Sequence, residues 1–201
     1  PILSAPITSR LYTPAEFGAL AGITVVAVLM GVVAHGLFSQ ILFLKQDLDA
    51  AKCVLQQGIV LNASMCAVVE LFLFSAFVIN PASIALAGEP VYSLLVPIFV
   101  FLVGIAQSCA GWANRTGQFT VMAANRTLTA VVASSLQIGL GYHGFGEKGL
   151  IAAFMLASSF SVVHYLLKLN SFGSMNPEVI SARRIRQTII EFRSMIGFSF
   201  F

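Results

Sequence analysis

The chain contains 201 residues, of which 58% are hydrophobic and only 9% are Asp, Glu, Lys or Arg. Soluble globular domains carry about 25% charged residues, so this composition excludes that class and, with a mean hydropathy of +0.90, predicts an all-α integral membrane protein. The small net charge of +3 does not indicate a nucleic-acid partner, and the three cysteines lack metal-ligand spacing, so no metal or other cofactor is expected.

The stretch before the first long apolar run carries a strong helix-start signal. Thr13 and Glu16 have the spacing of a capping box, and Pro14 falls at the first helical position, where its missing N–H costs nothing. Tyr12 and Phe17 are spaced as a hydrophobic staple. A run of 28 positions without a charged side chain begins at Phe17. Since about 20 helical residues cross a hydrocarbon core of roughly 30 Å, a membrane span is predicted to begin near Pro14.

Further apolar segments follow, and polar turns separate them. The end of the chain adds a basic stretch that we interpret as an amphipathic helix on the inner leaflet, with a plain solvated linker as the alternative. We interpret residues 1–8 as the end of a preceding membrane helix. The remaining predicted spans cover residues 53–88, 90–114, 127–146 and 149–167, which makes five complete spans and two partial ones. The predicted organisation is a transmembrane lobe at residues 1–168, a cytoplasmic amphipathic linker at 169–195 and the start of a seventh helix at 196–201.

The distribution of Lys and Arg predicts the orientation of these spans. Nine of the 11 Lys and Arg residues lie in the segments after the second, fourth and sixth helices, whereas Arg10 and Lys148 lie in the alternate turns. Basic residues that flank membrane helices are retained in the cytoplasm. We therefore expect the second, fourth and sixth helices to end in the cytoplasm, and Arg10 and residues 80–91 and 142–149 to lie outside.

Glu70 is the most specific single candidate for a functional residue, because it is the one charged residue of its span. A carboxylate near the middle of a span costs at least about 2.5 kcal/mol, so it should face the bundle interior or a wet cavity. Its role stays open between binding a coupling cation or proton, contacting substrate hydroxyls, and acting as a protonated structural residue bonded to a neighbouring helix.

Two arginines form the second candidate feature. The sequence Ala-Asn-Arg-Thr occurs twice, 11 residues apart, and places Arg115 and Arg126 on either side of a short predicted turn. Near the cytoplasmic mouth, guanidinium groups can attract phosphate. An equal alternative is that both determine topology and contact lipid headgroups.

Other patterns argue against nucleotide binding and catalysis. Residues 144–149 spell G-x-G-x-x-G, but they lie between two predicted membrane helices instead of after a strand, so we interpret them as a tight external turn. The chain shows no Ser-His-Asp set and no paired carboxylates, and its external loops are short. We therefore expect a protein that is not an enzyme.

Three stretches resemble the polysaccharide biosynthesis flippases, the O-antigen and exopolysaccharide exporters of the multidrug/oligosaccharidyl-lipid/polysaccharide superfamily. The resemblance spans residues 9 to about 168. It is carried by residues 10–18 (RLYTPAEFG), by 112–115 (WANR) with Phe119, and by 137–141 (QIGLG) with Gly144, Gly146 and 149–151 (GLI). Many members carry Arg-Tyr-Glu near the end of the second helix, where this chain has Gly-Leu-Phe at 36–38, so no role of that triplet is carried over.

The resemblance implies twelve to fourteen helices in two lobes, of which this chain is the N-terminal six-helix lobe. It implies translocation of an undecaprenyl-pyrophosphate-linked oligosaccharide across the bacterial inner membrane by alternating access, with membrane lipid and a C-terminal lobe as partners. Arg10, Arg115 and Arg126 are then candidates for holding the anionic head, and Glu70 for cation or proton coupling.

Two other functions stay open from the sequence. A multidrug/cation antiporter of the same superfamily would use Glu70 to bind cationic drugs. A membrane-bound glycan polymerase or ligase would be favoured by a long external loop with clustered Arg and His.

Overall fold

The computed structural model describes residues 4–44, 47–80 and 89–169, and these form six helices. The helices are α1 (Ala5–Leu11), α2 (Pro14–Leu44), α3 (Leu48–Ile79), α4 (Pro90–Arg115), α5 (Phe119–Tyr142) and α6 (Gly146–Lys168). The predicted all-α membrane bundle is thus confirmed. The predicted linker and the start of a further helix lie at residues 170–201, outside the described residues.

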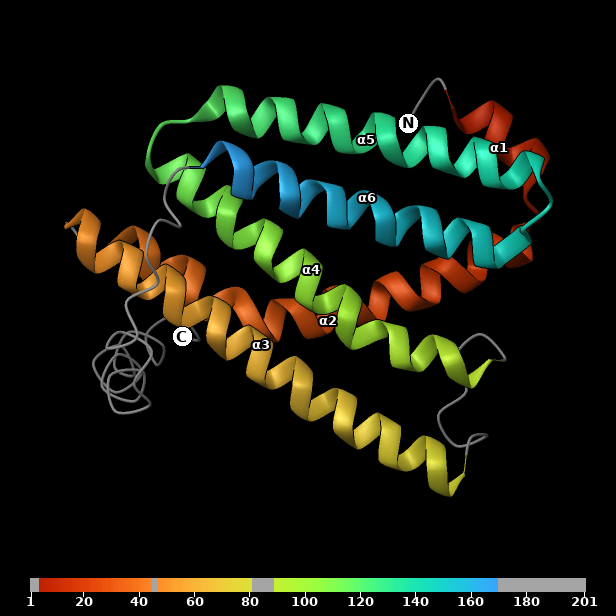
Figure 1. Cartoon of the computed structure of the whole chain (residues 1–201), viewed down its shortest axis with the longest axis horizontal. Helices are drawn as coiled ribbons and strands as arrows, with labels where there is room; N and C mark the ends of the chain where they lie inside the picture. The colour runs from red at the N-terminus through yellow and green to blue at the C-terminus, as the bar shows by residue number, and fades with distance from the viewer. Residues whose placement is uncertain (1–3, 45–46, 81–88, 170–201) are drawn as a thin grey trace, which may run out of the picture.

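The long helices pack as neighbours that run in alternating directions. Figure 1 shows α5 and α6 side by side, α4 next to α6, and α2 and α3 on the far side of α4. The end of α2, the start of α3, the α4–α5 turn and the end of α6 lie at one end of the molecule (Figure 1). We call this the basic end, because Lys52, Arg115 and Lys168 belong to it. The α1–α2 bend and the α5–α6 turn lie at the opposite end, so the predicted alternation of turns is present.

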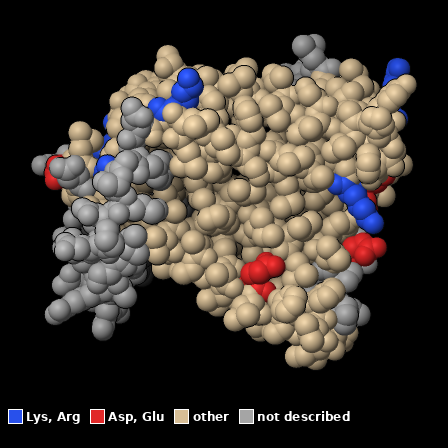
Figure 2. All heavy atoms as spheres, in the orientation of Figure 1, with Lys and Arg blue, Asp and Glu red and all other residues tan. Residues whose placement is uncertain are grey.

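Hydropathy supports several membrane crossings. Among the described residues, three helical stretches, Ala50–Ile79, Val91–Arg115 and Gly146–Lys168, are long and apolar enough to span a membrane. A fourth span results if Ala5–Leu11 and Pro14–Met30, which meet at 111°, are taken together. α5 does not reach the same hydropathy, because serine, threonine and amide side chains interrupt it. Figure 2 shows the result on one face, where uncharged side chains cover most of the surface.

One predicted boundary was wrong. The apolar pattern placed the start of a span at residue 127 and left Arg126 in the preceding turn. In the structure, α5 already begins at Phe119, and the turn between α4 and α5 covers only residues 116–118. The boundary was set by the charge of Arg126, but residues 119–125 (FTVMAAN) before it are mostly apolar and helical, so this charge lies within a helix and does not mark its start. Arg126 therefore lies inside a helix, about 10 Å along the axis from its start.

Two buried clusters hold the bundle together. The first joins α3, α4 and α6 near the basic end and centres on Trp112, Cys109 and Tyr165. The second joins α2, α3, α4 and α6 through residues such as Ile23 and Phe99. α4 contributes to both clusters and contacts α2, α3, α5 and α6, so it is the central helix against which the others are positioned.

The start of α2 forms as its sequence predicts. The Thr13 backbone N–H donates to the Glu16 carboxylate at 2.6 Å, and the Glu16 N–H donates to the Thr13 hydroxyl at 3.4 Å. The rings of Tyr12 and Phe17 meet edge to face with their centroids 5.9 Å apart. The capping box and the staple are both confirmed, and they fix the direction in which the chain leaves the bend.

Tyr12 also connects this bend to α5. It is buried, and its hydroxyl donates to the Gln137 carbonyl at 2.7 Å. Burial raises the pKa of the Tyr12 phenol and the nearby Glu16 carboxylate raises it further, so the hydroxyl keeps the proton that it donates. The bend is therefore held against the outer part of α5 by a hydrogen bond as well as by ring packing.

The contact between Tyr12 and α5 predicts opposite outcomes for two neighbouring glycines. A Cβ at Gly141 would lie 2.9 Å from the Tyr12 ring, whereas a Cβ at Gly139 would meet nothing within 4 Å. We expect Gly141→Ala to destabilise the protein by about 1–3 kcal/mol through overpacking. Gly139→Ala should be neutral or stabilising by up to about 1 kcal/mol, because alanine favours helix. Thermal unfolding in detergent measures both, and equal melting temperatures would contradict this packing.

Candidate functional site

A polar groove runs along the face where α1, α5 and α6 meet. Its volume is about 520 Å³, within the range of about 300–1,000 Å³ typical of ligand-sized pockets. Nine of its 14 lining side chains are polar, namely Ser4, Thr8, Asn125, Arg126, Thr129, Ser134, Gln137, Ser158 and Ser161. Polar side chains are thus gathered along this groove, although apolar atoms contribute most of its exposed surface.

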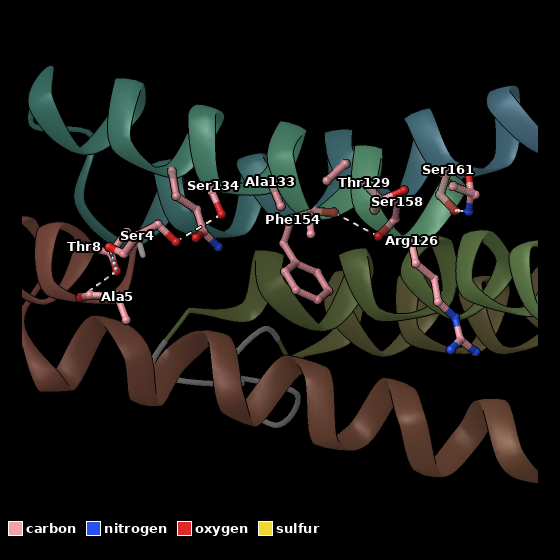
Figure 3. Close-up of a pocket in the computed structure, with 14 residues that line it drawn as sticks. Ser4, Ala5, Thr8, Arg126, Thr129, Ala133, Ser134, Phe154, Ser158 and Ser161 are labelled. Carbon is pink, nitrogen blue, oxygen red and sulfur yellow. Dashed lines mark hydrogen bonds between the residues drawn. The ribbon is translucent and has the colours of Figure 1, made fainter. Parts of the chain in front are cut away.

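The groove arises because one face of α5 and one face of α6 are both polar or small. On α5 the lining residues from Arg126 to Gln137 recur at intervals of three or four, as do those on α6 from Phe154 to Ser161. The remaining lining residues of α5, α6 and α1 are mostly alanines, which leave room between the helices. Figure 3 shows Arg126 and Ser161 toward one end of the groove and Thr8, Ser4 and Ser134 toward the other.

Hydrogen bonds define the end of the groove that lies away from the basic end. The Ser4 and Ser134 hydroxyls are 3.1 Å apart and join α1 to α5. One helical turn farther out, the Tyr12 hydroxyl reaches the Gln137 carbonyl. These contacts hold α1 against α5 and bound the groove on that side.

The hydroxyls of the lining differ in how they are used. The Thr8 hydroxyl donates to the Ser4 carbonyl at 3.2 Å, and the Ser158 hydroxyl donates to the Phe154 carbonyl at 2.9 Å. This bonding to the preceding turn is the usual solution for Ser and Thr in a helix. Thr129 does not adopt it: its hydroxyl oxygen is buried and has no hydrogen-bond partner among the described residues. A buried hydroxyl without a partner is rare in folded proteins and marks Thr129 as a position to explain.

A buried polar network lies beside the groove, toward the basic end. The Asn125 amide nitrogen donates to the Ser161 hydroxyl at 2.7 Å, and the His164 Nδ1 lies 2.9 Å from the Asn125 amide oxygen. Asn125 is only 3% exposed and Ser161 only 7%. The network fixes α5 against α6 at this level, immediately beside Arg126. The His164 ring also stacks on the Phe160 ring, with the two ring centroids 6.2 Å apart.

The structure separates the three candidate arginines. Arg126 is exposed and lines the groove, and it carries the single charge among the described lining residues. Arg115 is half-buried at the end of α4 and does not line the groove. Arg10 is exposed in the last turn of α1, near the bend. Of the three, only Arg126 is brought together with the polar lining, and the roles of the other two stay predictions.

Glu70 lies elsewhere, on α3, which contributes no described residue to the groove. It follows Asn62 and Cys66 at intervals of four, so the three side chains share one helix face. The Asn62 amide donates to the Phe101 carbonyl of α4 at 3.4 Å, and the Cys66 thiol donates to the Asn62 amide oxygen at 3.6 Å. This face is therefore the one that packs on α4.

The Glu70 carboxylate is half-buried, and its Oε2 has almost no exposed surface and no hydrogen-bond partner among the described residues. This agrees with the expectation that Glu70 faces inward. The missing partner argues against the structural role, in which this oxygen would be hydrogen-bonded to a neighbouring helix. A role of Glu70 in coupling stays a prediction.

Sequence reasoning missed most of the groove. Thr129, Ser134 and Gln137 on α5 and Ser158 and Ser161 on α6 were not singled out, although each lies in a predicted span. A usable signal was present, because polar residues recur on one face of each of these helices. No group of three or more His, Cys, Asp or Glu side chains that could hold a metal lies among the residues that the structure describes.

Comparison with known proteins gives one match. A family model described as "polysaccharide biosynthesis protein" matches residues 7–198, which is nearly the whole chain. No curated protein and no solved structure matches it.

Proposed function

Because the chain belongs to this family of polysaccharide biosynthesis proteins, we propose that it moves a lipid-linked oligosaccharide across the membrane. The substrate would be an oligosaccharide on an undecaprenyl-pyrophosphate carrier, and the membrane would be the bacterial inner membrane. The chain is a multi-pass membrane protein, and its family places it in the assembly of polysaccharide. Translocation is the step of such a pathway that needs a bundle of helices and no catalytic group.

The observation that carries the proposal is the polar groove inside an otherwise apolar bundle. A glycan head cannot cross hydrocarbon alone. Moving a hydroxyl out of water without a hydrogen-bond partner costs about 2–7 kcal/mol. Hydroxyl and amide side chains, such as those at Thr129, Ser134 and Gln137, can replace the water that those hydroxyls lose. A groove that opens to one side of the membrane at a time would then carry the head across by alternating access.

Charge distinguishes this proposal from drug export. A carboxylate is the natural electrostatic partner of a cationic drug, whereas the described lining of the groove contains Arg126 and no carboxylate. A guanidinium repels a cation and attracts a phosphate, with which it forms charge-assisted hydrogen bonds. The groove therefore favours an anionic substrate. Arg10 and Arg115 are proposed as further attractive charges for the pyrophosphate, and a second lobe as the opposite wall of the pathway.

Depletion of the protein in its host tests the proposed function. We expect surface polysaccharide to fall and single lipid-linked repeat units to accumulate in the membrane fraction, since synthesis of the unit continues while its transfer stops. Mass spectrometry of extracted lipid identifies the accumulated unit. Unchanged surface polysaccharide together with a gain in sensitivity to cationic drugs would contradict the proposal in favour of an antiporter.

A further inference from the structure

We propose that the groove binds its substrate in one orientation, with a phosphate at Arg126 and sugar rings along the stretch from Thr129 to Gln137. This inference rests on the function proposed above and assigns the parts of the substrate to parts of the groove. It also assigns the groove to the glycan head and not to the lipid chain.

The charge of the groove lies at one end only. Asn125 and Arg126 are the lining residues of α5 nearest the basic end, and of all the described lining residues only Arg126 is charged. Figure 3 shows the Arg126 side chain near the same end as Ser161, with its guanidinium group extending away from the row of hydroxyls. A phosphate group is therefore best satisfied at this end. If the basic end faces the cytoplasm, Arg126 meets the pyrophosphate where the loaded carrier starts, in the inner leaflet.

The remainder of the groove has the features of a sugar site. From Arg126 to Gln137 the groove follows 12 residues of α5, which span about 16 Å along the axis. Ala130 and Ala133 leave space over α5 in this stretch, and the Phe154 side chain of α6 also lines it, while its ring packs on Phe99 of α4 with centroids 5.2 Å apart. The apolar C–H face of a sugar ring packs on the negative face of an aromatic ring, while its hydroxyls seek polar partners at the edges.

Thr129 supplies an independent reason for a polar occupant. Its hydroxyl lies in the groove wall one turn from Arg126 and has no partner among the described residues. An isoprenoid chain would leave this hydroxyl and the Gln137 amide in an apolar environment. The Thr129 hydroxyl has almost no exposed surface, so the side chain must turn it toward the groove, where a sugar hydroxyl can then act as donor or acceptor.

Thr127 offers a matched control for Thr129 on the same helix. The Thr127 side chain is exposed, its hydroxyl already donates to the Ala123 carbonyl at 3.0 Å, and it does not line the groove. We expect Thr129→Val to lower export of the repeat unit roughly 2- to 10-fold, the effect of one lost hydrogen bond, with unchanged protein level. Thr127→Val should leave export unchanged, and equal effects of the two substitutions would contradict a contact between Thr129 and substrate.

Photocrosslinking in cells tests which part of the substrate lies in the groove. A photoreactive amino acid is placed at Ala133, which lines the groove, or at Val131, which is 57% exposed on another face of α5. Captured adducts are treated with mild acid, which cleaves the bond between pyrophosphate and the first sugar. An adduct formed through the glycan keeps its sugar mass, whereas an adduct formed through the lipid loses it.

The expected result is an adduct at Ala133 that keeps sugar mass after acid, and none of that kind at Val131. Ala130 serves as a second groove position if the Ala133 variant does not accumulate. Adducts at the groove positions that lose all sugar, or a lack of adducts in variants that still export, would overturn the proposed orientation and leave the transport function standing. A host whose surface polysaccharide is unaffected by depletion would instead overturn the transport function itself.

Discussion

Replacing Arg126 by glutamine is expected to lower export of the repeat unit by about 10- to 100-fold. The reason is that Arg126 carries the single charge among the described residues that line the groove. Hydrogen bonds to charged groups contribute about 1.5–3 kcal/mol, and each 1.4 kcal/mol corresponds to a factor of ten in affinity. The rate at which pulse-labelled glycan reaches the cell surface measures the effect, at matched protein levels.

Two further variants give this prediction its controls. Arg126→Lys keeps the charge but loses the planar fork that binds two phosphate oxygens, so an intermediate rate is expected. Lys168→Gln removes one positive charge from the basic end without touching the groove, because Lys168 is exposed at the end of α6. If Lys168→Gln and Arg126→Gln reduced export equally, the charge would act through topology or lipid contact and not through the substrate.

Replacing Glu70 by glutamine is expected to lower export by about 5- to 150-fold, the range of typical coupling free energies, and to abolish any dependence of export on pH or sodium. Glutamine keeps the size of the side chain and resembles its protonated form, so a step that requires loss of the proton or binding of a cation is blocked. The Glu70 Oε2 has no hydrogen-bond partner among the described residues, which argues against a structural hydrogen bond. If Glu70 nevertheless had such a role, glutamine would preserve it and export would not fall.

Glu89 provides the matched control for Glu70. It is exposed at the start of α4, so Glu89→Gln removes the same charge outside the bundle and should leave export unchanged. Export is compared over a series of pH values and sodium concentrations for both variants. Glu70→Gln export that follows the unsubstituted protein under all these conditions would remove Glu70 from the mechanism.

The helix boundaries that the sequence predicted well depend on local chemistry. The start of α2 was predicted to the residue, because Thr13, Pro14 and Glu16 act on one another within a single turn. The limits of α4 were predicted within one residue, since a proline opens it and a polar turn closes it. The start of α5 was missed by eight residues, because the boundary was placed after the charged Arg126, which lies inside the helix.

The groove could not be predicted because it depends on which helices become neighbours. Arg126 was proposed from its place beside a predicted turn near the cytoplasmic mouth, and the structure adds that it lies on the same face of α5 as Thr129 and Gln137. Ser161 contributes from a separate helix, and pairing of α5 with α6 brings its hydroxyl to Asn125. Glu70 was proposed because a carboxylate within a membrane span is energetically costly. That it lies away from the groove depends on how the helices pack together, which the sequence of one helix does not determine.

The central claim is that this protein carries a glycan head from one face of the membrane to the other. The most direct measurement is the sidedness of the lipid-linked repeat unit that accumulates after depletion. Intact spheroplasts are treated with an impermeant reagent that oxidises sugar diols, and lysed cells serve as the fully accessible reference. We expect the accumulated unit to be protected in spheroplasts and modified only after lysis. Accumulated units that are already modified in intact spheroplasts would contradict translocation and would indicate a later step, such as polymerisation or ligation on the outer face.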